Sequence, residues 1–211
     1  LLDTEEEFGI KTLMVNAHPP AGGDDDGRQA EIDAIMAFIR DAREPGGELT
    51  LKENTPVVIA GDMNLVGRIG QLITFLTGDI SNNELQGEDF APDWDGSAFT
   101  SITPRLSDQR MGYTWRNDFD FEYNYWPGHL DYIFYSDSVL DVAKSYVVHT
   151  SSMSSERLQL YGLEANDSLG SDHFLFVADF RPAFVDADGN GLPDFWEQVT
   201  FGDVGTSSAM E

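Results

Sequence analysis

An apolar run that ends in two oxygen-bearing side chains places the strongest constraint on how this chain folds. Residues 57–60 are all apolar, and Gly61, Asp62, Met63 and Asn64 follow at once. Side chains alternate along an extended strand, so Asp62 and Asn64 point the same way while Met63 points into the protein. Gly, Asp and Asn are also ordinary turn residues. The motif therefore predicts a buried strand that ends either in a simple turn or in a rigidly mounted pair of polar groups.

The residues before this run predict a strand–helix–strand unit. Residues 9–17 favour a strand that stops at His18, because the two prolines that follow cannot continue a central strand. Apolar residues recur at helical spacing over 28–43, and 56–60 form the next strand. A helix between two strands implies parallel pairing. We therefore expect His18 and Asp62 at one edge of one sheet, where open α/β sheets bind ligands.

The second half of the chain predicts mainly strands. A short helix is expected at 69–78, followed by a polar loop and then by strands at 113–116, 129–135, 140–149 and 173–180. Consecutive strands without long helices between them favour antiparallel pairing, so the sheet content is expected to be mixed. We expect one domain over 1–182 and a separate tail over 183–211.

Charge and composition limit the classes of protein. Twelve Lys and Arg against 38 Asp and Glu give a net charge of −26, so no basic surface for nucleic acid is expected. A substrate that carries phosphate would need a divalent cation to offset this repulsion. The chain has no cysteine, which excludes disulfides and thiolate metal sites. No apolar run is long enough to span a membrane.

Four short motifs carry Asp, Asn or His at predicted strand ends. They are NAH at 16–18, GDMN at 61–64, HLDYIF at 129–134 and GSDH at 170–173. Each motif alone is common in purely structural positions, because short matches carry a high risk of coincidence. Their presence together favours one shared site.

In these motifs the sequence resembles the endonuclease/exonuclease/phosphatase superfamily, which includes DNase I-like nucleases, sphingomyelinases and inositol polyphosphate phosphatases. The resemblance runs from Gly9 to Pro182, and GDMN, LDYIF and SDH are its most specific parts. It implies a DNase I-like α/β (α+β) fold, a four-layer sandwich of two packed mixed sheets. It also implies divalent-metal hydrolysis of phosphoesters, and carboxylate ligands without cysteine favour Mg²⁺ or Mn²⁺ there.

The resemblance implies a role for each motif residue. His18 would contact the scissile phosphate and donate a hydrogen bond or a proton to it. Asp62 would orient or deprotonate the attacking water, and Asn64 would steady the phosphoryl oxygens. In the later motifs, Asp131 would orient His173. The neighbouring residue, Asp172, would help to hold the metal ion.

Two departures from the family pattern bear on activity. His129 stands where many members have Arg, which weakens the contact with phosphate at neutral pH. Members also carry an early Asn and a metal-binding Glu, and the residues before Gly9 supply neither. Either this chain is the C-terminal part of the domain, with the missing N-terminal segment of the same protein as its partner, or the metal site is defective.

The tail contains a candidate calcium loop. Counted from Asp186, its oxygen ligands fall at the spacing of an EF-hand loop, and they belong to Asp186, Asp188, Asn190, Leu192 (through its carbonyl), Asp194 and Glu197. No amphipathic helix precedes the loop, so it resembles the Ca²⁺ loops of dockerin-like and thrombospondin type 3-like repeats. Such repeats belong to extracellular proteins, and we therefore expect a secreted or cell-surface protein.

Three hypotheses follow. The first is an extracellular, metal-dependent phosphoester hydrolase, specifically a phosphodiesterase or nuclease-like enzyme. The second is a non-catalytic binding or remnant module of the same fold with a calcium-binding tail. The third, a structural calcium-repeat protein, leaves the four ordered motifs to chance. Phospholipid headgroups, nucleotides and sugar phosphates all stay open as substrates.

Overall fold

A computed structural model of the chain describes residues 1–116, 125–183 and 186–205. Within these residues lie two β-sheets, one of four strands and one of two. The strands are β1 (Leu13–Asn16), β2 (Val57–Asp62), β3 (Thr100–Ser101), β4 (Asp131–Tyr135), β5 (Leu140–Val147) and β6 (Phe176–Pro182). The helices are α1 (Glu5–Phe8), α2 (Asp25–Ala42), α3 (Ile69–Thr77), α4 (Asn83–Gln86), η1 (Thr150–Ser152), α5 (Ser155–Tyr161), η2 (Asp167–Gly170) and α6 (Asp194–Phe201).

Strand β2 lies at the centre of the larger sheet, whose strand order is β1-β2-β4-β3. Strand β1 pairs with β2 in parallel, which confirms the predicted strand–helix–strand unit. Strand β4 runs antiparallel to β2, with Asp131 opposite Asp62. The sheet is therefore mixed, as expected, and its two central strands bring two carboxylates to one edge.

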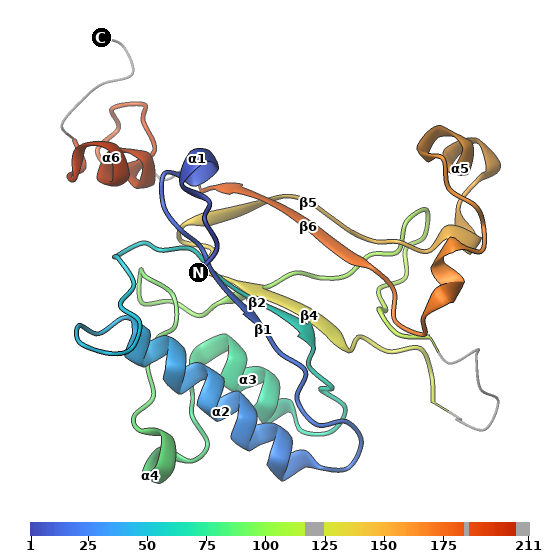
Figure 1. The fold of residues 1–211 in the computed structure, drawn as a ribbon, viewed down its shortest axis with the longest axis horizontal. Helices are drawn as coiled ribbons and strands as arrows, with labels where there is room; N and C mark the ends of the chain where they lie inside the picture. The colour runs from blue at the N-terminus through green and yellow to red at the C-terminus, as the bar shows by residue number, and fades with distance from the viewer. Residues whose placement is uncertain (117–124, 184–185, 206–211) are drawn as a thin grey trace.

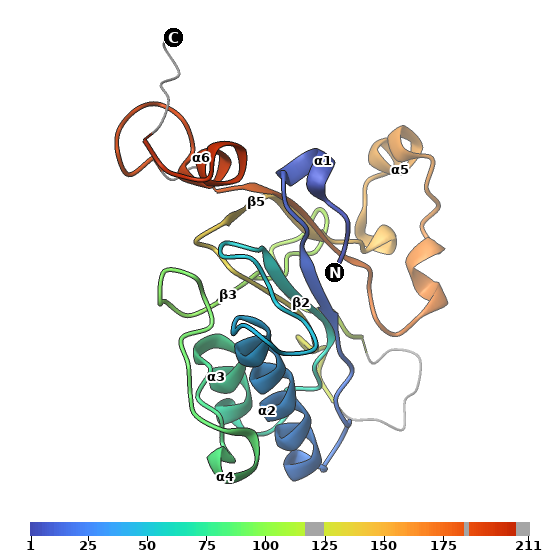
Figure 2. The same ribbon diagram turned by 60° about the vertical axis from the view of Figure 1, so that its left-hand side comes forward.

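Both faces of β2 are buried, which explains its continuous apolar sequence. Val57 and Ile59 belong to a core shared with α2 and α3, while Val58 belongs to a second core that reaches β5 and β6. Figures 1 and 2 show the resulting layers, with α2 and α3 on one side of the four-stranded sheet and β5–β6 on the other. A strand covered on both faces cannot shift its register without exposing one of the two cores.

The long helix α2 begins earlier than its apolar pattern predicts. The side chain of Asp24 accepts a hydrogen bond from the Gly27 backbone N–H at 3.0 Å, so it caps the helix and allows a start at residue 25. Ile32, Met36 and Ile39 are fully buried and fix one face of α2 against the sheet. The predicted helix at 69–78 is also present, as α3.

Several predicted strands are shorter than expected. Strand β1 starts only at residue 13, because α1 occupies residues 5–8 and ends at Gly9 in the left-handed conformation (φ 71°). Strand β4 starts at 131, β5 ends at 147 and β6 starts at 176. The predicted strand at 113–116 is reduced to bridges at Trp115. His18 and His173 therefore lie just outside the regular pairing, whereas Asp62 and Asp131 are the end residues of β2 and β4 and pair with each other.

The second sheet differs from the expected one. Its two described strands, β5 and β6, are antiparallel, which confirms the pairing predicted for the second half of the chain, whereas the family resemblance implies a mixed sheet. The connection between them carries η1, α5 and η2, which the sequence pattern does not predict, and it extends to the right in Figure 1. Among the described residues, no helical layer covers the outer face of β5–β6, so they form three layers of the expected four.

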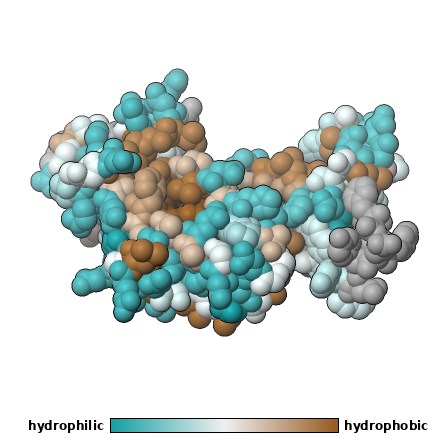
Figure 3. Space-filling view, turned by 60° about the horizontal axis from the view of Figure 1, so that its bottom comes forward, coloured by the Kyte–Doolittle hydropathy of each residue, from teal (hydrophilic) through white to brown (hydrophobic). Residues whose placement is uncertain are grey.

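The surface combines high negative charge with exposed apolar side chains. Figure 3 shows a largely hydrophilic face on which hydrophobic residues gather in a hollow. Leu2, Trp126, Leu160 and Leu175 are among the large apolar side chains that are more than half exposed. In the described part of the chain, every helix is too short or too polar to cross a membrane.

We expect Gly61→Ala to destabilise the fold strongly. Gly61 has a φ of 147°, and a Cβ at this position would lie 2.0 Å from the carbonyl oxygen of Ala17 on the adjoining chain segment. A backbone atom cannot move aside cheaply, so we expect a loss of about 1–3 kcal/mol in the free energy of unfolding and a fall of several degrees in Tm. Gly23→Ala is the control, because a Cβ there meets nothing within 4 Å. Equal Tm values for the two variants would contradict this interpretation.

Candidate active site

A His–Asp pair forms the centre of the candidate site. The Nδ1 atom of His173 lies 2.8 Å from Oδ2 of Asp131, within hydrogen-bond distance. Asp131 is the first residue of β4, and His173 lies just before β6. The two side chains are 19% and 30% exposed, so water reaches the pair only in part. The structure thus brings together the Asp and His that the sequence predicts to be partners.

Asp62 faces two imidazole rings from separate chain segments. Its Oδ2 atom lies 3.4 Å from Nε2 of His18 and 3.5 Å from Nε2 of His173. The Asp62 side chain is 15% exposed, whereas that of His18 is 71% exposed and open to solvent. Distances above 3.2 Å are long for direct hydrogen bonds, so these contacts are weak and the atoms keep capacity for another hydrogen-bond partner beside them.

The surroundings of Asp62 change its acidity. Burial is the largest effect and raises the pKa of the Asp62 carboxyl, and the nearby negative charge of Asp131 raises it further. The backbone N–H of Asn64, at 3.0 Å from Oδ1, and the two imidazoles act in the opposite direction without cancelling the rise. A carboxylate with a raised pKa is a better proton acceptor near neutral pH than an ordinary Asp.

Asn64 and Arg28 hold the segment that follows His18. Asn64 is buried, has a positive φ of 50°, and donates from Nδ2 to the Pro19 carbonyl at 3.0 Å. The fully buried guanidinium of Arg28 donates to the carbonyls of Pro20 and Gly22. These bonds fix the backbone on the C-terminal side of His18. Contact of Asn64 with phosphoryl oxygens stays a prediction.

Asp172 directly precedes His173 in the chain, and its carboxylate contacts an aromatic residue. Its Oδ2 atom accepts a hydrogen bond from the indole Nε1 of Trp115 at 3.1 Å, and the residue is exposed. Sequence reasoning gives no signal for this contact, because it depends on a bridge between residues 115 and 173 that are far apart in the chain. One exposed carboxylate oxygen suits Mg²⁺ or Mn²⁺. Around the His–Asp pair, however, the described residues do not bring three potential ligand atoms together.

His129 does not replace the positive charge of an Arg. Its ring stacks on that of Tyr132 with 3.8 Å between centroids. Burial is the main influence on His129 and lowers the pKa of its imidazole, which disfavours the charged ring. Its role as a phosphate contact is therefore weaker than that of Arg, in agreement with the sequence-based expectation.

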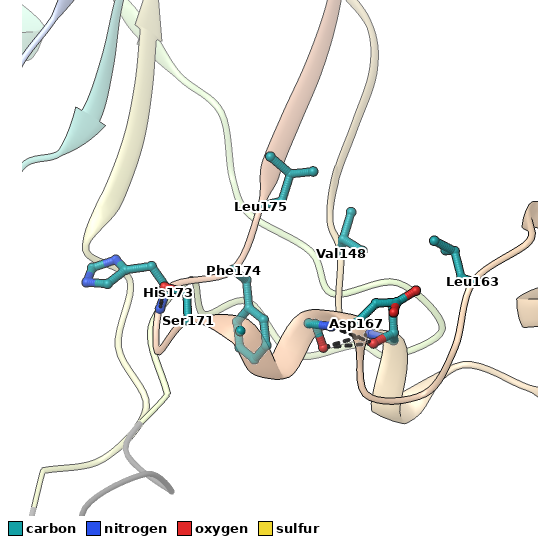
Figure 4. A pocket seen from close by; sticks show the side chains of 10 residues that line it. Val148, Leu163, Asp167, Ser171, His173, Phe174 and Leu175 are labelled. Carbon is teal, nitrogen blue, oxygen red and sulfur yellow. Dashed lines mark hydrogen bonds between the residues drawn. The ribbon is translucent and has the colours of Figure 1, made fainter.

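A cavity of about 340 Å³ lies next to His173, between η2 and the start of β6. Its lining is partly apolar, with Val148, Leu163 and Leu175, and partly polar. Figure 4 shows the His173 ring pointing away from the side chains of this cavity. The His173 ring therefore faces Asp62 on β2 and Asp131 on β4 rather than this cavity.

The tail places three of its predicted ligands together. Carboxylate oxygens of Asp186, Asp188 and Asp194 lie within 4.8 Å of one another. The fully buried carboxylate of Glu197 stands outside this group and accepts hydrogen bonds from Asn190 Nδ2 at 2.8 Å and from a backbone N–H.

Two further predicted ligands have less direct support. Asn190 Oδ1 accepts a hydrogen bond from the Leu192 N–H at 2.8 Å, and a role for the Leu192 carbonyl stays a prediction. The described tail is thus an oxygen-rich loop that continues into the first turn of α6, which begins at Asp194, whereas residues 206–211 lie outside the described part.

We expect Asp62→Asn to raise the stability of the protein at neutral pH. The folded-state pKa of Asp62 is raised above the ordinary 3.8, so the carboxyl ionises less readily in the folded than in the unfolded protein. The folded protein therefore loses stability as the pH rises through the folded-state pKa. Asn mimics the protonated form. The Tm of Asp62→Asn, measured in EDTA, should exceed that of the parent at pH 7 and converge with it below pH 3.8.

The control for this comparison is Glu31→Gln, an exposed site on α2. It removes the same charge far from the site. An Asp62→Asn protein that is less stable than the parent at pH 7 and unchanged in its pH dependence would show that Asp62 is an ordinary structural carboxylate.

Comparison with known proteins agrees with this geometry. A search among curated proteins gives no match. A family model, described as the endonuclease/exonuclease/phosphatase family, matches residues 12–173 and so includes His18, Asp62, Asp131 and His173. Because this match covers well over half of the chain, the chain belongs to the endonuclease/exonuclease/phosphatase family, whose members are generally phosphoester hydrolases.

Proposed function

We propose that this chain carries the catalytic centre of a metal-dependent phosphodiesterase. The observation that carries the proposal is the Asp131–His173 pair with its free Nε2 directed at Asp62. Hydrolysis of a phosphodiester needs an activated water, a group that stabilises the negative charge on the phosphoryl oxygens and a proton donor for the leaving oxygen. The three side chains of this edge, together with His18, have the chemistry for those tasks.

Each residue acts through a definite atom. Asp131 accepts from Nδ1–H of His173 and so leaves Nε2 for the reaction, because a neutral imidazole has one donor and one acceptor nitrogen. Asp62, whose pKa is raised by burial, orients the water and accepts its proton. His18, mostly exposed on its ring, contacts the phosphoryl oxygen or protonates the leaving group. Atoms from three chain segments thus surround one reacting centre.

A divalent cation completes the proposal. Mg²⁺ or Mn²⁺ would neutralise charge on the non-bridging oxygens when bound. Asp172 is the candidate ligand in this chain, and the remaining ligands would come from outside the described residues. The net charge of −26 supports the need for such an ion, because the surface repels an anionic substrate.

The fold offers a place for the remaining metal ligands. An apolar cleft of about 650 Å³ lies between the two sheets, lined by Met14, Val58, Ile133 and Phe176, among others. We propose that further strands of the same protein cover this cleft and extend the second sheet. Such strands would bury the apolar lining and could present the metal-binding Glu that the family resemblance implies.

A non-catalytic module of the same fold is the alternative. It is favoured by the incomplete set of metal ligands around Asp172 in the described residues. It would bind a phosphoester without cleaving it. The assay below separates the two, because only an enzyme requires both the His–Asp pair and the cation.

We expect hydrolysis of bis-p-nitrophenyl phosphate by the full-length protein to require Mg²⁺ or Mn²⁺ and to stop with EDTA. His173→Ala should abolish turnover, and Asp131→Asn should reduce it by about 10²- to 10⁴-fold, the typical contribution of a proton-transfer group. Rate and Tm are measured on the same preparations.

Glu31→Gln serves as the control and should keep the parent rate. A His173→Ala protein that is destabilised but fully active per folded molecule would end the catalytic interpretation. Activity that is undiminished by EDTA would end the metal mechanism.

We propose further that the tail binds Ca²⁺. The convergence of Asp186, Asp188 and Asp194 supports this proposal, together with the EF-hand spacing that extends to Glu197. Ca²⁺ takes six to eight oxygen ligands at modest affinity in extracellular modules. A secreted or cell-surface location is proposed on the same ground, because free Ca²⁺ is abundant there.

We expect calorimetry to show Ca²⁺ binding with a Kd of about 10⁻⁴–10⁻³ M, the range of extracellular modules. The double variant Asp186→Ala with Glu197→Gln should lose it. Asp203→Asn is the control, because it lies in the tail outside the loop and its amide oxygen can still accept from the Val204 N–H. Unchanged binding in the double variant would show that the loop is only a turn.

A further inference from the structure

Thr114 is a buried residue that is hydrogen-bonded to the backbone of Asp131 and to the residue that follows His173. Its side chain is fully buried, and it lies on the short segment that bridges the residues before β4 and the residues before β6. It carries no charge and matches none of the four motifs. Its hydrogen bonds nevertheless reach the backbone of Asp131 and the residue that follows His173.

The hydroxyl of Thr114 accepts two backbone hydrogen bonds at the start of β4. Its Oγ1 atom lies 3.1 Å from the N–H of Leu130 and 2.9 Å from the N–H of Asp131. A hydroxyl oxygen has two lone pairs, so these two donors use its full acceptor capacity. The hydroxyl therefore sets the position and direction of the backbone that carries the Asp131 carboxylate.

The backbone of Thr114 holds the other half of the pair. Its carbonyl accepts from the N–H of Phe174 at 2.8 Å, directly after His173. Its own N–H donates to the Gly128 carbonyl at 2.9 Å, and Trp115 forms bridges with both Gly128 and His173. One residue thus connects two segments that lie more than 40 positions apart in the chain.

We propose that Thr114 is a positioning residue, which acts through Asp131 to keep the Nδ1–Oδ2 contact at 2.8 Å. This inference rests on the proposed function, since the pair matters for rate only if it is catalytic. Without the hydroxyl, two buried N–H groups lose their acceptor, and the backbone shifts to find water or another carbonyl. A displacement of about 1 Å at a catalytic group can cost about 10²-fold in rate.

The test uses two matched variants. Thr114→Val keeps the shape of the side chain and removes the acceptor, whereas Thr114→Ser keeps the hydroxyl and removes the methyl group. We expect Thr114→Val to lower kcat for bis-p-nitrophenyl phosphate by about 10²-fold with little change in KM. Thr114→Ser should stay close to the parent in kcat. If Thr114→Val does not fold at the assay temperature, Thr114→Ala, which also lacks the hydroxyl, is compared with Thr114→Ser at a temperature at which both variants are folded.

A second readout does not depend on activity. In protein labelled with ¹⁵N-histidine, the Nδ1 proton of His173 shared with Asp131 should give a downfield NMR signal. It should persist in Thr114→Ser, and it should be lost to exchange with solvent in Thr114→Val or Thr114→Ala.

The two readouts separate the possible failures. An inactive parent protein with this NMR pattern would refute the proposed function but support the role of Thr114. A hydroxyl-free variant that keeps the signal and the parent kcat would overturn the inference. Equal losses in Thr114→Ser and Thr114→Val would also overturn it, because packing of the methyl group would then be the cause.

Discussion

The pairing of β2 between β1 and β4 is the constraint on which the rest of the structure depends. It puts the end of β1, the end of β2 and the start of β4 at one edge of the sheet, and so it brings His18, Asp62 and Asp131 together. A shift of one residue would move every side chain of β2 to the opposite face. Since Val57 and Val58 are buried in different cores, either direction of shift would expose apolar surface. Packing on both faces of β2 therefore determines which side chains lie together at this edge of the sheet.

The same edge of the sheet brings two carboxylates close together, which is electrostatically unfavourable. Asp62 and Asp131 lie opposite each other on adjacent strands, and burial raises the pKa of Asp62. A fold selected only for stability would place a neutral or apolar residue there. Local hydrogen bonds limit the cost, since Asp131 is bonded to His173 and Asp62 accepts from the Asn64 backbone. Such conflicts between local stability and charge are typical of functional sites.

The parts of the site that the sequence could predict are those carried by single strands. An apolar run ending in Asp62 indicates a strand end without any knowledge of its neighbours, and the motif around Asp131 does the same. The position of His173 could not be derived in this way, because it lies before β6 and is held by bridges to Trp115. Thr114 gives no sequence signal either, since its role depends on backbone donors far along the chain. The sequence pattern does not predict the three helical segments between β5 and β6, because they are short and lack an apolar period.

The source of positive charge decides how such an acidic protein can accept a phosphoester. Several of its arginines are already engaged in local ion pairs: Arg28 with Asp25, Arg68 with Asp26 and Arg157 with Asp108. Burial lowers the pKa of His129, which disfavours its charged form. What the site itself offers is imidazole, which carries charge only below its pKa, and carboxylate oxygen, which attracts a cation rather than phosphate. In the proposed mechanism, a divalent ion would compensate the charge of the substrate. His18 and His173 would then act as hydrogen-bond and proton-transfer groups and would not be the only counter-charges to the substrate.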